Sequence, residues 1–504
     1  MAQVKPYKWT VMVNLAGDNN LSEEMVWALT EMRKVGSNDH VAVIAQLDSI
    51  IHEYTRLPIK CRPDAGTLDH DLNEARELKA RQAQENGGRN GSRSGRVPSY
   101  FYAIYDFVSE CVDRYKAERY MLILSGHGHS AINNFLTKDG HDGKTDGFSP
   151  RRLRGLVQRI NRELLGEKKL EILALDCCLA SSAEIAHEVV DDVAVMIGAQ
   201  GYEPLAGWPY ANILRTIQEA ASDDTRMLAQ KLVSTYVQYY KDYLAAGTSV
   251  DQAAYDLCEY DTLKRAVINL SQVLCAFLPT STPENARERD LATDREVRNA
   301  LILAHWEAQP FRFQQYTDLY DFCSLLKAYC AKNEVQEACE SVIEAIAGRQ
   351  NPEHEVKPLV LKSCYSGPDV QYSNGVSIYF PWSEEPSEMR KYRRLYFAKE
   401  AGWADFLDAY FWATKREPRG TGPLRDSIDR IDLDFSVDLL GHRDASPNRD
   451  ASPNRDASPN RDASPNRDLA NAYGGGSMRN PATAYRDCDC SVEHVRVDGI
   501  RLDG

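Results

Sequence analysis

The stretch 171–182 constrains the fold more than any other part of the chain. It is an apolar run that ends abruptly in an acid, two adjacent thiols and small residues. A short apolar run bounded by turn-forming residues is typical of a buried strand. A second such run, 120–125, ends in His127 between two glycines. The sequence therefore predicts two buried strands that present an imidazole and a thiol, that of Cys178, at their carboxyl ends.

The other regular segments alternate between strand-like and helix-like spacing. We predict parallel strands at 9–15, 40–47, 120–125, 171–176 and 193–199, an added antiparallel piece at 53–59, and helices that begin with Ser22 as a cap or cover 101–112, 153–160 and 182–190. This alternation indicates an α/β fold with a mostly parallel, doubly wound sheet. Ligands bind such sheets beyond the carboxyl ends of the strands, which is where His127 and Cys178 are predicted to lie.

Composition divides the chain into three parts. They are a core at 1–210 with an exposed polar insertion at 60–98, a mainly helical region at 211–415 that completes the fold and contains a strand at 375–380, and a low-complexity tail at 416–504. The tail contains four tandem Arg-Asp-Ala-Ser-Pro-Asn repeats at 443–466. A short polar repeat with a proline in each unit and no large apolar residue has nothing to pack, so we predict disorder.

Several classes of protein are disfavoured by the composition of the 504 residues. No run approaches the roughly 18 apolar residues of a membrane span, and residues 1–8 lack the apolar stretch of a secretory signal, so we expect a cytoplasmic protein without membrane contact. A net charge of −14 and the lack of a basic stripe argue against nucleic acid. The 12 cysteines are dispersed, and the adjacent pair rarely forms a bridge, so thiols are expected.

The imidazole and the thiol together suit nucleophilic catalysis. Cys178 would attack, His127 would carry the proton, and the backbone N–H groups of Gly128 and Cys178 would form an oxyanion hole. Small residues after Cys178 permit a tight turn into the predicted helix at 182–190, whose amino terminus would favour the thiolate. Two alternatives remain: burial without function, and a zinc site that includes His129, although adjacent cysteines lack the two-residue gap of structural zinc sites.

Five blocks of the chain together resemble one known family. They are 9–21, 122–128, 175–181, 203–210 and 374–381. In this order they are similar to clostripain-like cysteine peptidases, relatives of caspases, gingipains and legumain, and the resemblance covers about residues 8–412. It implies a caspase-like αβα sandwich and an endopeptidase with a Cys/His dyad, here His127 and Cys178.

The resemblance also implies a substrate pocket. The family has an aspartate two residues before the nucleophile, so Asp176 selects Cys178 over Cys177 and resembles the floor of a pocket for arginine and, in some members, lysine. A buried carboxylate can make two charge-assisted hydrogen bonds to guanidinium. The alternative for Asp176 is a turn-capping acid. Ala206 occupies a position that is glycine or acidic in some members of the family, and Glu203 is the candidate that could replace that acid.

Members of this family are often made inactive and then cut in an exposed loop. The candidate processing residues are Lys144, which lies in a predicted surface loop at 138–149, Arg151, and Arg89, Arg93 and Arg96 in the insertion. The resemblance implies no required cofactor. Calcium activates some relatives, and Asp139, Asp142 and Asp146 could supply oxygen ligands, although their spacing matches no EF-hand loop.

The expected partners follow from this interpretation. They are protein or peptide substrates with exposed arginine or lysine and an upstream activating protease, in the setting of a bacterial protease cascade. The alternative function is a non-catalytic caspase-like scaffold that recruits partners through its tail.

Overall fold

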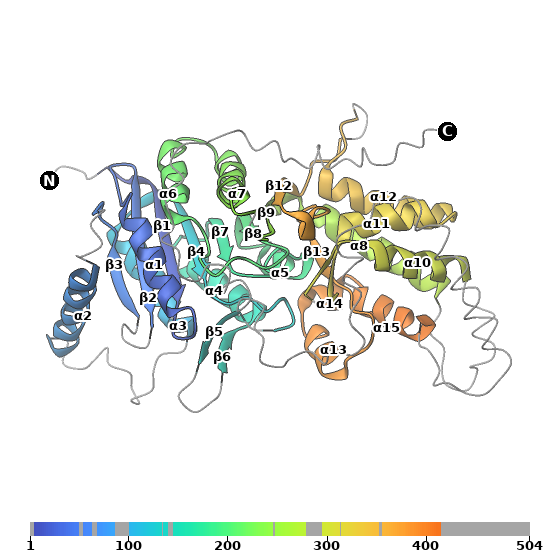
Figure 1. Ribbon diagram of the computed structural model, residues 1–504, viewed down its shortest axis with the longest axis horizontal. Coiled ribbons are helices and arrows are strands. Elements are labelled where there is room, and N and C mark those ends of the chain that lie inside the picture. The colour runs from blue at the N-terminus through green and yellow to red at the C-terminus, as the bar shows by residue number, and fades with distance from the viewer. Residues whose placement is uncertain are drawn as a thin grey trace.

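The computed structural model describes residues 5–49, 54–62, 68–85, 100–133, 135–139, 145–244, 247–278, 295–312, 314–351 and 355–414. Its centre is an eight-stranded sheet (Figure 1). In spatial order the strands are β12 (Val360–Ser366), β9 (Val250–Asp256), β8 (Val193–Gly198), β7 (Leu170–Asp176), β4 (Ala117–Ser125), β1 (Tyr7–Ala16), β2 (Val41–Asp48) and β3 (Thr55–Pro58). The run from β8 to β2 is parallel, whereas β3, β9 and β12 pair antiparallel with their neighbours.

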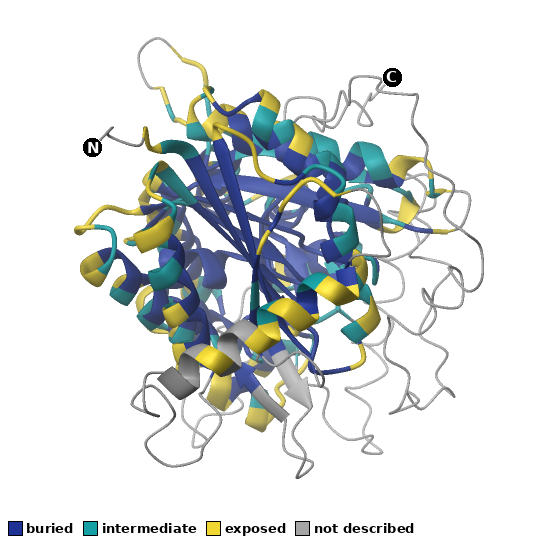
Figure 2. Cartoon of the chain, turned by 90° about the vertical axis from the view of Figure 1, so that its left-hand side faces the viewer, coloured by how far each residue is buried: buried dark blue, intermediate teal, exposed yellow. Residues whose placement is uncertain are grey.

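Helices cover both faces of this sheet. One face packs against α1 (Ser22–Arg33), α6 (Tyr210–Glu219) and α7 (Thr225–Lys241), and the other against α3 (Tyr100–Arg114), α4 (Pro150–Glu163) and α5 (Ala183–Val189). Alternate residues of β1 enter the two cores, Val11 and Val13 on the α1 side and Met12 on the α3 side, as the period of a strand requires. Figure 2 shows the buried strands enclosed by helices whose outer surfaces are exposed. The predicted αβα sandwich is confirmed.

Residues beyond 210 form further sheet strands and a helical region. This region contains α8 (Tyr260–Phe277), α10 (Arg295–Glu307), α11 (Leu319–Tyr329), α12 (Asn333–Ala347), α13 (Pro386–Tyr392), α14 (Tyr396–Glu400), α15 (Trp403–Thr414), the 3₁₀ turns η3 (Leu257–Glu259) and η5 (Pro368–Val370), and a small sheet of β10 (Pro310–Phe311), β11 (Tyr316–Asp318) and β13 (Ser377–Tyr379). Its apolar side chains join the core on the α3 side. Figure 1 shows most of these helices gathered at one end of the sheet.

Strands β9 and β12 are absent from the sequence prediction, which places only the 375–380 strand in this region. Both β9 and β12 contain buried polar side chains, so neither has the apolar run that identifies β4 and β7. In β9, Asp251 and Gln252 are each 1% exposed. Tertiary hydrogen bonds therefore stabilise a strand that its own composition does not indicate.

Three local predictions need correction. The insertion contains a helix, α2 (Leu68–Glu85), in which Leu72 is buried and Asp71 accepts hydrogen bonds from Arg33 at 3.0 Å and Arg62 at 2.8 Å. The predicted loop at 138–149 contains the antiparallel hairpin β5 (Phe135–Asp139) and β6 (Thr145–Phe148).

Helix α1 is also capped differently from the prediction. Ser22 is its first helical residue rather than its cap, because the side chain of Asn19 accepts the N–H of Leu21 and builds the turn before it. The 86–99 segment and the repeat tail lie outside the described residues. Of the helices described, none has the length and apolar character needed to cross a membrane.

Candidate active site

The sheet brings the predicted imidazole and thiol to one edge. Strand β4 pairs with β7 in a register that places Ser125 opposite Asp176, and with β1 in a register that places Ser125 opposite Leu15. The loops after these three strands therefore lie next to one another at the same edge of the sheet. One small pocket of about 20 Å³ lies there, lined by Leu21, Met25, Ser125, Gly126, His127, Asp176, Cys177, Cys178, Glu203, Pro204, Leu205 and Gly207. All four side chains predicted for catalysis or substrate binding line this pocket.

Gly128 packs directly against the backbone of Cys178. A β-carbon at position 128 would lie 1.9 Å from the carbonyl oxygen of Cys178 and 2.8 Å from its nitrogen, so no side chain fits there. The glycine that follows the imidazole thus permits the β4 loop to touch the β7 loop. The two backbones that would form the oxyanion hole are thus in contact, and the role of their N–H groups stays a prediction.

The turn after Cys178 is built from backbone hydrogen bonds. Leu179 has a left-handed backbone (φ 59°), and its N–H donates to the carbonyl of Gly201 at 2.9 Å. Helix α5 begins only at Ala183, where Ser182 caps it by accepting the N–H of Ile185. Helix α5 thus lies where the sequence predicts a helix at 182–190, and residues 179–182 separate its amino terminus from Cys178.

The thiol of Cys178 is covered. The N–H of Glu203 donates to Sγ at 3.2 Å, the thiol faces the Glu203 carbonyl at 3.8 Å, and Cys178 is only 7% exposed. Burial, with the nearby Glu203 carboxyl as a smaller cause, raises the pKa of Cys178 to about 12. Burial therefore favours the neutral thiol in this conformation, and the stabilisation of a thiolate stays a prediction.

Asp176 and Glu203 form a buried acid pair, each 3% exposed. Asp176 Oδ1 accepts the N–H of Trp208 at 3.0 Å, and Oδ2 accepts the hydroxyl of Tyr210 at 2.6 Å. Burial raises the pKa of both acids, and the nearby charge of Asp176 raises that of Glu203 further. Glu203 therefore holds the proton that the two carboxyls share.

The contacts of Asp176 fit the turn-capping interpretation. Gly207, with a left-handed backbone (φ +61°), would place a β-carbon 3.0 Å from Asp176 Oδ1, so this glycine lets the 203–210 segment close over the carboxyl. The arginine-pocket interpretation requires that segment to admit a guanidinium. That role of Asp176 and Glu203 stays a prediction.

Two groups of site residues were missed by the sequence analysis. The Nε2 atom of His127 lies 2.6 Å from Oδ1 of Asn20, in the loop after β1. Asp251 on β9 accepts the N–H groups of Gln200 at 2.7 Å and Gly201 at 2.8 Å. These two residues lie just before Glu203, whose backbone covers the thiol of Cys178. Asn20 belongs to a turn-forming cluster that the sequence does show. Nothing in the sequence identifies Asp251 as a site residue, because a single acidic residue usually lies on the protein surface.

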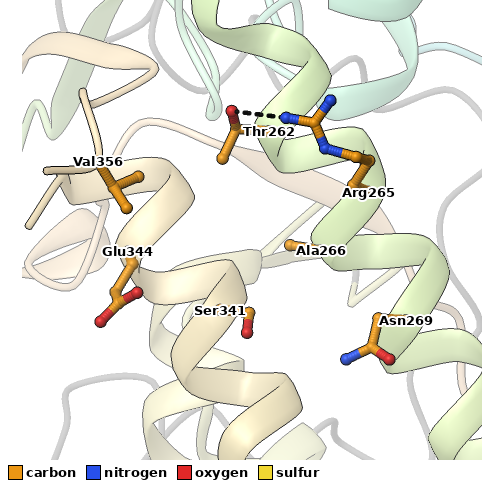
Figure 3. A pocket seen from close by; sticks show the side chains of 7 residues that line it. All are labelled: Thr262, Arg265, Ala266, Asn269, Ser341, Glu344 and Val356. Atoms are coloured by element: carbon orange, nitrogen blue, oxygen red, sulfur yellow. Dashed lines mark hydrogen bonds between the residues drawn. The ribbon is translucent and has the colours of Figure 1, made fainter. Parts of the chain in front are cut away.

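A larger hollow lies away from these residues. It is a groove of about 280 Å³ between α8 and α12, lined by Thr262, Arg265, Ala266, Asn269, Ser341, Glu344 and Val356 (Figure 3). Its lining includes no thiol or imidazole, so it cannot carry the chemistry predicted for the strand ends.

The sequence raised two metals as candidates, zinc and calcium. Among the described residues, one set of three ligand atoms lies mutually within 4.8 Å, that of His70, Asp71 and Glu74, and two arginines already engage Asp71. The alternative of zinc held by His127, His129 and the cysteine pair is not supported by this geometry. Asp142 is outside the described residues, and the side chains of Asp139 and Asp146 are not described, so calcium stays a prediction.

The candidate processing residues fall mostly outside the described chain. Lys144, Arg89, Arg93 and Arg96 all do, although Lys144 directly precedes β6. Arg151 is exposed in the first turn of α4, with its guanidinium 5.7 Å from the ring of Tyr396.

A parallel sheet that presents an imidazole and a thiol at neighbouring strand ends is the architecture of caspase-like cysteine peptidases. A comparison of the sequence with known protein families gives the same class of protein. The family model of the clostripain family matches residues 13–412, so the chain belongs to the clostripain family of cysteine peptidases.

Individual relatives are more distant. Clostripain from Hathewaya histolytica is 24% identical over 363 residues, which cover 63% of this chain and 65% of clostripain, slightly less than two thirds of its length. The X-ray structure of "iotapain", a secreted C11 cysteine protease from Bacteroides thetaiotaomicron, matches with a TM-score of 0.52 at 13% identity, covering 79% of this chain and 99% of that one. An inactive zymogen C11 protease from Parabacteroides distasonis has a TM-score of 0.49 at 15% identity over the same shares. The iotapain likeness supports the fold.

Proposed function

We propose that this chain is a cysteine endopeptidase that cleaves after arginine, and less readily after lysine, through a dyad of Cys178 and His127. The observation that carries the proposal is the shared pocket, in which an imidazole, a thiol and two buried acids meet beyond the ends of β4, β7 and β8. Membership of the clostripain family supports the same chemistry.

The reaction follows from the roles of these groups. His127 takes the proton of Cys178 as sulfur bonds to the carbonyl carbon, and the N–H groups of Gly128 and Cys178 stabilise the oxyanion. The carbon–nitrogen bond then breaks as His127 gives the proton to the leaving amine. Water, deprotonated by His127, attacks the acyl-enzyme and releases the acid and the thiol.

The buried acid pair supports the preference for arginine. Two carboxyls in a dry pocket cannot both ionise at neutral pH, because desolvation and mutual repulsion oppose the second charge. A guanidinium that enters the pocket supplies the missing positive charge and can donate hydrogen bonds to both acids. Asp176 and Glu203 would then bind the substrate side chain, and the proton on Glu203 would leave as the guanidinium enters.

The covered thiol supports a form that needs activation. A pocket of about 20 Å³ holds a single water molecule, and an arginine side chain is several times larger. Residues 201–207 must therefore move before substrate reaches Cys178. We propose that cleavage in an exposed loop releases them. The loop with Lys144 is favoured over Arg151, whose backbone is helical, because peptidases bind their substrates as extended chains.

A non-catalytic scaffold that recruits partners is the second candidate, and the burial of Cys178 favours it. An arginyl acyloxymethyl ketone distinguishes the two functions. The peptidase reacts at one cysteine and cleaves arginyl peptides, whereas the scaffold does neither, even after limited proteolysis. Cleavage by the Cys178→Ala variant would refute the dyad.

The activator can be identified with the same variant. Inactive Cys178→Ala protein, mixed with the wild type, is cut at the Lys144 loop if the enzyme processes itself. If it is cut only by an added trypsin-like protease, an upstream enzyme is required.

We propose a cytoplasmic setting within a bacterial protease cascade. Fractionation of cells that express the chain, with detection in the soluble fraction, tests the location.

A further inference from the structure

The Asn20 side chain meets the imidazole of His127 from the neighbouring strand. We propose that Asn20 is a positioning residue, whose amide oxygen holds the proton of His127 on Nε2 and so reserves Nδ1 for proton exchange with Cys178 and substrate. The proposal rests on the peptidase function proposed above. The observation behind it is the 2.6 Å separation of Asn20 Oδ1 and His127 Nε2.

Hydrogen bonds of its neighbours order the backbone of the loop that carries Asn20. The N–H of Gly17 donates to the carbonyl of Asp48 at 2.7 Å, and the side chain of Asn19 both donates to the Ala16 carbonyl at 3.1 Å and accepts the N–H of Leu21 at 2.8 Å. These bonds do not involve the imidazole. The residues on either side of Asn20 are thus ordered independently of the imidazole, which suits a positioning role.

The chemistry of an amide oxygen determines which nitrogen carries the proton. A carbonyl oxygen accepts hydrogen bonds and cannot donate them, so the ring nitrogen that faces it must bear hydrogen. A neutral imidazole has only one N–H, and with that proton on Nε2 the other nitrogen is the base. Nδ1 is thus the atom that takes the proton of the Cys178 thiol.

The same contact serves the second half of acylation. After Nδ1 accepts the proton, the ring is a cation with two N–H groups, and Asn20 still accepts from Nε2. Nδ1–H then protonates the leaving amine as the carbon–nitrogen bond breaks, and the ring returns to its starting tautomer. Asn20 touches neither substrate nor reacting atom and acts only through His127.

The choice of leaving group isolates this role from simple damage to the fold. An amine must be protonated to leave, whereas an aryl oxide leaves readily without an acid. We expect Asn20→Ala to reduce kcat for an arginyl peptide amide about 10- to 100-fold, a part of the 10²–10⁴ that general acid–base catalysis contributes. Hydrolysis of an arginyl aryl ester should fall much less, and KM should change little.

Two further variants complete the test on activated full-length protein. Asn20→Asp keeps an acceptor oxygen and should recover most of the amide activity, and Asn333→Ala, an exposed asparagine at the start of α12, should behave as wild type. An unchanged amide-to-ester ratio in Asn20→Ala, or an Asn20→Asp variant as impaired as Asn20→Ala, overturns the proposal. Because the ratio is measured within one preparation, partial unfolding does not alter it. Activity in Cys178→Ala would instead refute the peptidase mechanism itself.

Discussion

The contact between Gly128 and Cys178 predicts the effect of a single methyl group. In Gly128→Ala the new β-carbon would fall 1.9 Å from the carbonyl oxygen and 2.8 Å from the nitrogen of Cys178, well inside van der Waals contact. Both are backbone atoms that no rotamer change can move, so the β4 and β7 loops must separate by an ångström or more. Overpacking of this kind costs about 1–3 kcal/mol of stability.

The loss of activity should be larger than the loss of stability. His127 precedes Gly128 directly, so separation of the loops carries the imidazole away from the thiol. A misplacement of about 1 Å costs on the order of 10²-fold in rate. We expect the activated Gly128→Ala variant to cleave an arginyl peptide at least about 100-fold more slowly, with both kcat and the rate of labelling of Cys178 reduced.

A matched glycine provides the control. Gly155 lies within α4, and a β-carbon there would meet only the ring of Phe101 at 3.8 Å, an ordinary contact. Gly155→Ala should leave activity unchanged and raise the unfolding free energy by up to about 1 kcal/mol, because alanine favours the helix. Wild-type activity in Gly128→Ala would show that the two loops are not packed as described.

Three other perturbations have defined outcomes. Asp176→Asn should lower kcat/KM for arginyl substrates by about 10²-fold or more, since a buried charge loses its partner, and should leave any cleavage after uncharged residues unaffected. Before processing, Cys178 should react slowly with iodoacetamide at pH 8, because burial raises its pKa to about 12, and at least tenfold faster after processing. Burial raises the pKa of Glu184 to about 7 from 4.5, so its stabilising contribution, on the order of 3 kcal/mol, is full below pH 4.5 and is lost as pH rises through 7. Thermal unfolding of Glu184→Gln should therefore depend less on pH between 5 and 8 than that of wild type, and equal pH dependence would contradict this.

The central strands, and the edge of the sheet at which the site lies, could be predicted because they depend on the local pattern of apolar residues. Strands β1, β4 and β7 are apolar runs that stop at turn-forming residues, and a parallel sheet brings their carboxyl ends together whatever the loops do. That geometry placed His127 and Cys178 in one pocket without further information.

The remaining features depend on tertiary contacts that leave no mark on nearby sequence. Asp251 becomes a buried strand residue only because the loop at Gln200 donates hydrogen bonds to it. The cover over Cys178 arises from the backbone of Glu203, which any residue could supply. Asn20 looked like one more turn-forming residue, and only the neighbouring β4 loop gives its amide a partner.

The most direct test of the account identifies the cysteine that attacks substrate. The activated chain would be treated with an arginyl acyloxymethyl ketone, digested, and analysed by mass spectrometry beside the Cys178→Ala and Cys177→Ala variants. The account predicts an adduct on Cys178 in wild type and in Cys177→Ala, and no adduct in Cys178→Ala. An adduct on Cys177, or peptide cleavage that survives the loss of Cys178, would contradict it.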